Sequence, residues 1–366
     1  MEKKKVFIGM SGGVDSSVSA ALLKEGWFLP AGRQVDVTGV FIKVWEPPAD
    51  LLPAGCSWRD DRRDASKVAA ILDIPFVILD LEKEYKQEVV DYMIAEYKAG
   101  RTPNPDVMCN RYIKFGGFYD WARAQGADFV ATGHYAQIKK NESGIFELHA
   151  GHDQNKDQTY FLWTLSQDIL AHTLFPIGHL EKPAVRKLAE KYKLPVATKK
   201  DSQGLCFMGK INVKDFLKEY IDEKKGEVIN EIGEVIGHHD GIMFYTLGER
   251  RGFTITKKTP TDDPYFIVGK NIETNQLIVS HNRRPVGDTS DTFTLKNVNW
   301  NTGVEPDQNK QYQARSRYRQ TLVSCHLSLK NGLWQATLGQ SDEIPTPGQS
   351  LVVYDTTHCL GGGVIV

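Results

Sequence analysis

The chain has 366 residues, 41% of them hydrophobic, and a formal net charge of −1. This length allows two to three domains with packed cores, and the near-neutral charge gives no sign of nucleic-acid binding through bulk electrostatics. A negative mean hydropathy and the lack of a long apolar run argue against a membrane span. Because residues 1–5 lead straight into the first predicted strand, they leave no room for a signal peptide, and we expect a cytoplasmic protein.

Residues 6–17 predict a buried strand, a glycine-rich turn and the start of a helix. The turn contains Gly12 and Gly13, and the apolar residues after it have the spacing of one helix face. Free N–H groups and the positive end of the helix dipole make such a place an anion site. The glycines let the backbone approach a phosphate, and the serines at 11, 16 and 17 add hydroxyl donors. The turn therefore predicts a phosphate cradle without the lysine of a Walker A loop.

Two other interpretations compete at this turn. Gly9 to Gly13 fits the Gly-x-Ser-x-Gly nucleophile elbow of hydrolases, and a glycine-rich turn can also be purely structural. The complete string SGGVDSS resembles the PP-loop of ATP pyrophosphatases, which cleave ATP between its α and β phosphates and adenylate a substrate. Since an elbow does not need the Asp-Ser-Ser that follows Gly13, the pyrophosphatase interpretation is favoured.

The next 120 residues alternate between strand and helix patterns. Strands are predicted at 35–42 and 76–79, helices at 60–72 and 82–99, and a further strand at 128–135. A loop with two prolines, residues 101–110, opens another helix. This alternation predicts a doubly wound parallel sheet of the α/β class, with its ligands beyond the carboxyl ends of the strands. We expect the PP-loop, the turn at Gly133 and the proline-rich loop to meet there.

The character of the chain changes after residue 210. Short alternating segments separated by glycines predict a small β-rich domain at 211–280, and the strand-and-turn pattern of the last part predicts a β-barrel at 281–366. The α/β domain then covers residues 1–210. Arg315, Arg317 and Arg319 occupy every second position, so in a strand they would share one face. A solvated surface and an RNA contact explain that stripe equally well.

The five cysteines are too scattered for a disulfide scaffold. The chain contains no Cys-x-x-Cys pair, so a structural zinc site is not expected. Cys109 lies at the start of a predicted helix, where the dipole would lower a thiol pKa. Cys206 lies in a polar loop with glycines. Both could still be inert buried thiols. Cys56, Cys325 and Cys359 are interpreted as structural, and the histidines at 238 and 239 lack partners at ligand spacing, so we predict no metal site.

Seven segments together resemble the bacterial tRNA-specific 2-thiouridylases, collinearly from residue 5 to 366. They are SGGVDSS, GRTPNPDVMCNRYIKF, ATGHYA, KDQTYFL, DSQGLCFMG, RYRQ and CLGGGVI. One departure is the longer link at 26–34, interpreted as a surface insertion. The resemblance implies that the enzyme activates the wobble uridine of tRNA with ATP and replaces its 2-oxygen with sulfur. Mg²⁺ should accompany ATP. The partners implied are tRNA and a sulfur-carrier protein or cysteine desulfurase that donates a persulfide.

The resemblance also assigns roles to residues. Cys206 receives and presents the persulfide, Cys109 attacks it and is left in a disulfide with Cys206, and Asp106 acts as an acid or base. An Asx-turn is the structural alternative for Asp106. The residues expected to bind ATP are Gly9, Met10, Ser11, Gly12, Gly13, Val14, Asp15, Ser16, Ile42 and Gly133. Those expected to contact tRNA are Asn104, Pro105, Asp106, His134, Lys156, Asp157, Gln158, Arg317, Tyr318 and Gln349.

Three other functions remain open to test. Another PP-loop adenylating enzyme would need neither Cys109 nor Cys206. A serine hydrolase would depend on Ser11. A tRNA-binding accessory protein would bind tRNA without consuming ATP.

Overall fold

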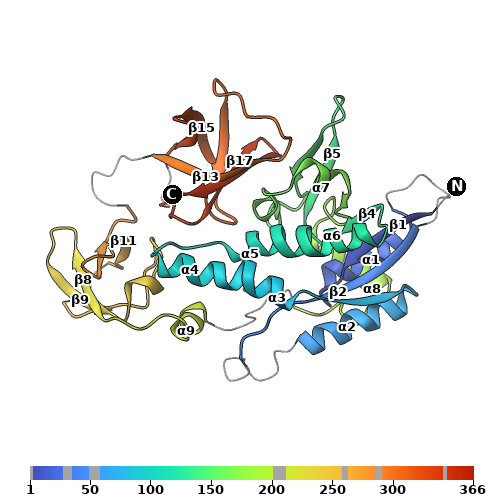
Figure 1. The fold of residues 1–366 in the computed structure, drawn as a ribbon, viewed down its shortest axis with the longest axis horizontal. Coiled ribbons are helices and arrows are strands. Elements are labelled where there is room, and N and C mark those ends of the chain that lie inside the picture. The colour runs from blue at the N-terminus through green and yellow to red at the C-terminus, as the bar shows by residue number, and fades with distance from the viewer. Residues whose placement is uncertain are drawn as a thin grey trace.

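The computed structural model describes residues 3–27, 35–48, 58–200, 212–257, 263–284, 291–340 and 344–366. Figure 1 shows an α/β body at the N-terminus, a small β-rich body and a C-terminal barrel. Three sequence predictions lie outside the described residues. They concern Cys56, Cys206 and residues 28–34 of the 26–34 insertion.

The N-terminal sheet is parallel, with strand order β3-β2-β1-β4-β7. Its strands are β1 Lys4–Gly9, β2 Val35–Lys43, β3 Phe76–Asp80, β4 Phe129–Ala131 and β7 Thr173–Leu174. From β1 the chain builds outward through β2 and β3, then crosses to the other side for β4 and β7. This reversal is the topological switch point where doubly wound sheets bind ligands, and the glycine-rich turn follows β1 there. The predicted α/β fold is confirmed.

Helices cover both faces of this sheet. Val6 and Ile8 of β1 are fully buried in a core completed by α1 Val14–Lys24, α2 Trp58–Ile71 and α8 Lys182–Lys191. The opposite face packs against two helical rods that lie side by side (Figure 1). One rod comprises α3 Glu82–Tyr85, a π-helical stretch Lys86–Asp91 and α4 Tyr92–Lys98; the other comprises α5 Pro105–Met108, a π-helical stretch Cys109–Gly117 and α6 Phe118–Ala124.

A smaller set of elements completes the N-terminal body and connects it to the barrel. They are the hairpin β5 Ala136–Lys140 and β6 Phe146–Ala150, a 3₁₀ turn Thr159–Phe161 and α7 Gln167–Ala171. The hairpin belongs to the barrel sheet rather than to the parallel one, because β6 pairs with β18.

The central body is a five-stranded sheet of order β10-β9-β8-β12-β11. It follows α9 Val213–Lys218 and contains β8 Gly226–Asn230, β9 Val235–His239, a 3₁₀ turn Ile242–Phe244, β10 Thr254–Ile255, β11 Phe266–Asn271 and β12 Gln276–Ser280. It packs on the end of the first helical rod, where a Cβ on Gly100 would lie 2.7 Å from the Ile272 side chain.

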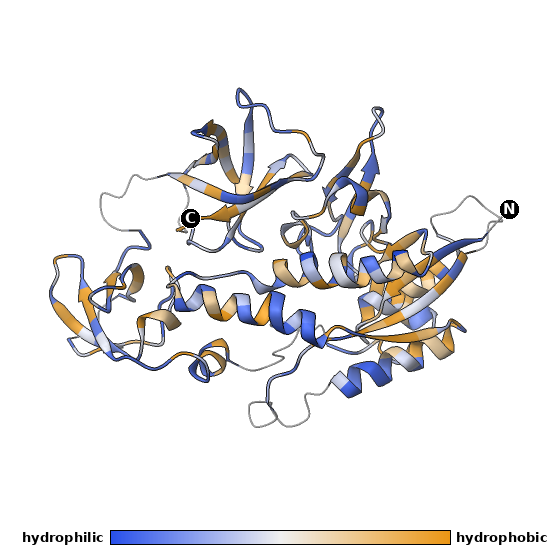
Figure 2. Ribbon diagram, in the orientation of Figure 1, coloured by the Kyte–Doolittle hydropathy of each residue, from blue (hydrophilic) through white to orange (hydrophobic). Residues whose placement is uncertain are grey.

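The C-terminal body is a closed barrel of order β13-β16-β15-β14-β17-β18, completed by pairing of β13 with β18. Its strands are β13 Thr292–Trp300, β14 Gln311–Arg315, β15 Val323–Lys330, β16 Leu333–Leu338, β17 Ser350–Asp355 and β18 His358–Ile365. The predicted barrel is confirmed. Its core is a cluster of buried apolar residues that includes Leu327, Ala336 and Leu351, and Figure 2 shows hydrophobic and hydrophilic stretches mixed along its strands.

The prediction that Arg315, Arg317 and Arg319 share one face of a strand is wrong. Strand β14 ends at Arg315, and Arg317 and Arg319 lie in the turn that follows. Arg319 has φ +64°, which interrupts any strand. The Arg315 side chain turns inward and forms a buried ion pair with Asp157 of the N-terminal body.

None of the described helices has the length and apolar character needed to cross a membrane.

The Arg315–Asp157 pair predicts a large effect on stability. Replacing Arg315 with Ala would leave a buried, unpaired carboxylate, which costs about 3–5 kcal/mol. Urea unfolding of Arg315→Ala should show that loss of free energy. The matched control is Lys310→Ala, which breaks an exposed ion pair with Asp355 in the same barrel and should change the unfolding midpoint little. Equal midpoints for the two variants would contradict the buried-pair argument.

Candidate functional site

The glycine-rich turn is held rigid by its own serines. Ser16 Oγ accepts a hydrogen bond from the Ser11 N–H at 3.2 Å, and Ser17 Oγ donates to the Gly13 carbonyl at 2.7 Å. Gly12 has φ +71°, and a Cβ there would collide with the Asp61 carbonyl, so only glycine fits. The N-cap of α1 is Gly13, whose lack of a side chain leaves the helix N-terminus open to an anion.

Two lysines that sequence reasoning missed complete this turn. Lys182 Nζ lies 2.8 and 2.9 Å from the two carboxylate oxygens of Asp15. Lys199 Nζ donates to the Gly12 carbonyl at 3.0 Å and to Asp61 and Asp64. Burial would lower the pKa of Lys199, but its hydrogen bonds to the two aspartates outweigh burial and raise it, so the side chain stays cationic. Both lysines are far from the turn in sequence, so no local motif could reveal them.

Gly133 lies against the start of α1, and Ile42 lies beside the end of β1. A Cβ on Gly133 would be 2.7 Å from the Ser16 backbone nitrogen, so β4 can approach α1 only through glycine. A Cβ on Gly9 would be 3.9 Å from the Ile42 side chain. The structure therefore gathers the predicted ATP-binding positions around the end of β1.

A pocket of about 370 Å³ lies where the three bodies meet. Its lining comprises Pro103, Asn104, Pro105, Asp106, Phe161, Thr246, Arg317, Tyr318 and Gln349. Six of these are predicted tRNA contacts: Asn104, Pro105, Asp106, Arg317, Tyr318 and Gln349. Sequence reasoning missed Phe161 and Thr246. Phe161 belongs to the KDQTYFL segment, but no local signal distinguishes its ring, which lies 4.6 Å from the ring of Tyr318.

The proline-rich loop at this pocket is fixed from the other two bodies. Gln349 Nε2 of the barrel donates to the carbonyls of Thr102 and Pro103, at 2.9 and 3.0 Å. The Thr102 hydroxyl donates to the Thr246 hydroxyl of the central body at 3.0 Å. Arg317 crosses the same interface and donates to the Leu247 carbonyl at 2.8 Å. The pocket exists only when all three bodies are docked.

Asp106 enters the pocket from the first turn of α5. The side chain that caps this helix is that of Asn104, not Asp106: Asn104 Oδ1 accepts a hydrogen bond from the Val107 N–H at 3.3 Å. Burial raises the pKa of Asp106, and the charge of nearby Lys114 offsets only part of this. A carboxyl group with a raised pKa suits proton transfer near neutral pH.

His134 does not line the pocket but lies between it and the glycine-rich turn. Its Nδ1 is 2.7 Å from the Thr132 hydroxyl, and its Nε2 is 3.5 Å from Lys114 Nζ. Burial and the charge of Lys114 hold the pKa of His134 well below 6.5. The imidazole is therefore neutral. The charge of Lys114 acts on both His134 and Asp106.

The predicted contacts at residues 156–158 lie beside the interface with the barrel. Asp157 is buried, pairs with Arg315 and accepts from the Thr159 hydroxyl at 2.9 Å. Gln158 Oε1 accepts from the Tyr135 N–H at 3.0 Å. Lys156 is partly exposed. None of the three lines the pocket.

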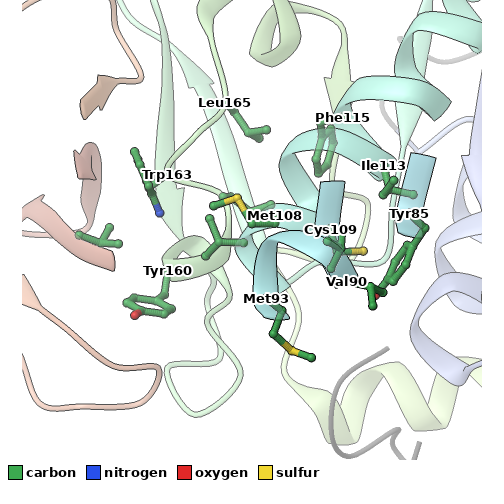
Figure 3. Packing of buried hydrophobic residues seen from close by; sticks show 14 of the residues in the cluster. Tyr85, Val90, Met93, Met108, Cys109, Ile113, Phe115, Tyr160, Trp163 and Leu165 are labelled. Carbon is green, nitrogen blue, oxygen red and sulfur yellow. The ribbon is translucent and has the colours of Figure 1, made fainter. Parts of the chain in front are cut away.

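Cys109 is buried, with 3% of its surface exposed, among Tyr85, Val90, Met93 and Ile113 (Figure 3). The expected dipole effect on its thiol does not hold, because the helix begins at Pro105 and the dipole acts within the first turn. Cys109 instead opens the π-helical stretch that ends at Gly117. Cys206 lies outside the described residues. Within the described ranges, no group of three His, Cys, Asp or Glu side chains is placed to hold a metal ion.

The fold and site define a PP-loop α/β domain joined to two small β-rich domains. Family models with three descriptions match the chain in order: tRNA methyl transferase HUP domain at 4–210, tRNA methyl transferase PRC-barrel domain at 214–281 and aminomethyltransferase beta-barrel domain at 290–365.

Relatives of nearly full length are tRNA-specific 2-thiouridylases MnmA. The protein of Nitrosomonas europaea is 45% identical, covering 100% of this chain and 99% of the relative. That of Enterococcus faecalis is 44% identical, covering 99% and 95%. Among solved structures, NMN synthetase from Francisella tularensis has a TM-score of 0.31 at 17% identity, covering 58% of this chain and 72% of its own. The chain belongs to the tRNA-specific 2-thiouridylase family.

The neutral His134 predicts a pH dependence of stability. The pKa of His134 in the folded protein lies below 6.5, so near pH 6 this side chain binds a proton in the unfolded chain but not in the folded one. Stability therefore falls as pH drops below 6.5. The slope for one proton is at most about 1.4 kcal/mol per pH unit. His134→Gln should lose this part of the slope in urea unfolding between pH 7 and pH 5.

The matched control keeps the imidazole and changes its packing. The control variant is Phe115→Leu, which removes a ring that lies 6.0 Å from that of His134. It should lower stability at every pH but keep the wild-type slope. An unchanged slope in His134→Gln would mean that the folded protein accepts the proton.

Proposed function

We propose that this protein is an ATP-dependent tRNA uridine 2-sulfurtransferase that adenylates the wobble uridine at O2 and replaces this oxygen with sulfur. The observation that carries the proposal is the three-body pocket, which joins a carboxyl group of raised pKa to an arginine and an aromatic ring. Phosphates favour arginine, and an unstacked base favours an aromatic partner. The size of the pocket suits one extruded nucleoside.

ATP would be held by the glycine-rich turn, with Gly9 to Ser16 around the phosphates and Ile42 and Gly133 flanking the adenosine. The residues fit this substrate, because Ser11 is exposed, the end of α1 is open, and Lys182 and Lys199 keep positive charge beside the turn. Mg²⁺ would accompany the phosphates and neutralise part of their charge.

The sulfur would travel through Cys206. The Cys206 thiolate attacks the terminal sulfur of the donor's persulfide, and the donor leaves as a thiolate. The terminal sulfur on Cys206 then attacks the adenylated C2, and AMP departs with the former O2. Cys109 attacks Cys206 Sγ, which forms a Cys109–Cys206 disulfide and leaves C2=S on the base. A dithiol reductant restores both thiols. Asp106 would hold or release the proton at the base.

The burial of Cys109 bears on this sequence of steps. A thiol that is 3% exposed reacts only with a sulfur that is brought into direct contact with it, since a disulfide needs its two Cβ atoms about 4 Å apart. The π-helical stretch that starts at Cys109 is where the rod departs from regular helix geometry, and such stretches occur often at functional sites. We propose that this stretch moves when tRNA fills the pocket.

The activity is tested with purified protein, ATP-Mg²⁺, a persulfide donor and unmodified tRNA, followed by digestion and analysis for 2-thiouridine. Wild type should produce it, and Cys109→Ser and Cys206→Ser should not. Both variants should keep tRNA-dependent release of pyrophosphate, and only Cys109→Ser should also release AMP, because AMP departs when the sulfur on Cys206 attacks C2. Cys325→Ser is the matched control, since that buried thiol lies inside the barrel. Unchanged release of AMP and pyrophosphate in all three variants, with no 2-thiouridine from wild type, would favour another adenylating enzyme.

The other two functions predict different results in this assay. Binding of tRNA without ATP consumption would identify an accessory protein. Loss of ester hydrolysis in Ser11→Ala would identify a hydrolase, although the Ser11 hydroxyl contacts Ser16 at 3.3 Å in the described structure.

The pocket predicts a specific role for Tyr318. Tyr318→Ala should raise KM for tRNA about tenfold, since stacking on an aromatic ring contributes about 1–3 kcal/mol per base. The affinity for ATP should not change, because Tyr318 lies in the barrel. Trp27→Ala removes an exposed ring stacked on His179, outside the pocket, and should leave both constants unaltered. A KM for tRNA equal to that of wild type would exclude Tyr318 as a stacking partner.

A further inference from the structure

A groove of about 490 Å³ lies between α2 and β3, apart from the pocket and from the glycine-rich turn. One wall carries the basic side chains Arg62, Arg63 and Lys67 of α2. The other carries Phe76 and Ile78 of β3, with Ile78 46% exposed. β3 is an edge strand of the parallel sheet, so its outer side also offers backbone groups to a partner.

The acidic residues of α2 are paired with basic side chains, Asp60 within the groove and the other two outside it. Asp61 and Asp64 bind Lys199, and Asp60 pairs with Arg63 at 2.8 Å. In the described part of the chain, Arg62 and Lys67 form no ion pair; Arg62 instead lies over the Trp58 ring at 5.1 Å. The groove thus combines an apolar centre with unpaired positive charge on its rim, which is the anatomy of a protein–protein interface.

The groove lies close to the chemistry. α2 packs on the glycine-rich turn at Asp61, and Lys199, bound to Asp61 and Asp64, anchors the chain just before the segment that contains Cys206. Cys206 follows Lys199 by seven residues in the sequence. A protein seated in this groove would therefore dock beside the described chain that leads into the Cys206 segment.

The groove fits an acidic protein better than RNA. Four basic and three acidic side chains give α2 a net charge of only +1, so the long-range field that attracts phosphates is weak. Ile78 offers no stacking surface for a base. Figure 1 also shows α2 on the opposite side of the molecule from the barrel, which contributes Arg317 and Tyr318 to the pocket. In Figure 2, the hydrophilic first turns of α2 lie near the apolar β3.

We propose that the groove between α2 and β3 is the docking surface for the persulfide donor, a protein with acidic side chains around an apolar patch. This inference rests on the proposed function, because it names the partner that supplies sulfur to Cys206. Carboxylates of the donor pair with Arg62 and Lys67, and its apolar patch covers Phe76 and Ile78.

The test uses the full-length protein and two probes, a purified cysteine desulfurase and the sulfur-carrier protein it loads, both from the source organism. The variant is Arg62→Glu with Lys67→Glu. Its matched control is Lys187→Glu with Lys191→Glu on α8, where Lys191 likewise lies over a ring, that of Tyr192, at 5.4 Å. Ile78→Asp tests the apolar centre. Circular dichroism and urea unfolding show whether each variant folds.

The groove variants should weaken calorimetric binding of at least one donor about tenfold or more, and raise KM for that donor equally. The control should do neither. Binding of tRNA and single-turnover release of pyrophosphate should stay at wild-type levels, as should thiolation driven by excess small-molecule persulfide. Higher salt should weaken the wild-type complex more than that of the double variant.

Three outcomes overturn the proposal. Donor affinity equal to that of wild type in folded groove variants shows that the donor docks elsewhere. Loss of tRNA affinity with unchanged donor affinity shows that the groove binds RNA. If neither donor binds the wild type, no docking surface exists for them. If a donor binds but wild type makes no 2-thiouridine from any sulfur source, the proposed function fails while the docking surface is still judged by the calorimetry.

Discussion

The buried ion pair between Asp157 and Arg315 joins the N-terminal body to the barrel, and the pocket depends on that junction. Around it, the Tyr160 hydroxyl donates to the Ser316 carbonyl at 2.8 Å and to the Ser350 carbonyl at 3.1 Å. Two buried charges cost free energy unless they are paired and hydrogen-bonded, so the pair tolerates only one relative position of the two bodies. That position sets Arg317, Tyr318 and Gln349 opposite the loop that carries Asp106.

The glycine-rich turn and the pocket are connected through one short series of contacts. Gly133 packs on Ser16, His134 follows Gly133, and Lys114 lies between His134 and Asp106. A single positive charge therefore acts on both groups. It helps to keep the imidazole neutral and limits how far burial raises the pKa of the carboxyl group. The pocket and the glycine-rich turn are thus separated by side chains, not by a domain boundary.

Strand–helix alternation predicted the parallel sheet, the strand-and-turn pattern predicted the barrel, and the string SGGVDSS predicted the turn after β1. The positions at the pocket came from the resemblance to a known family. The sequence could not place Lys182 and Lys199, whose partners lie more than a hundred residues away. It misplaced the arginine stripe, since the alternation at 315–319 looks like a strand but a left-handed residue and a buried partner end it. It also placed Cys109 at a helix start, because nothing local revealed that the helix begins at Pro105 or that a π-helical stretch starts at this thiol.

The pairing of β6 with β18 has a consequence for how the chain folds as it is made. Cys359 pairs with Leu148, so a strand close to the last residue completes the sheet edge offered by a hairpin near the middle. A growing chain emerges from the ribosome N-terminus first. The hairpin at 136–150 therefore keeps an open edge until β18 has been made, and open edges invite wrong pairing. Closure of the barrel and protection of the hairpin depend on the same strand, so a polypeptide truncated before β18 leaves this edge exposed.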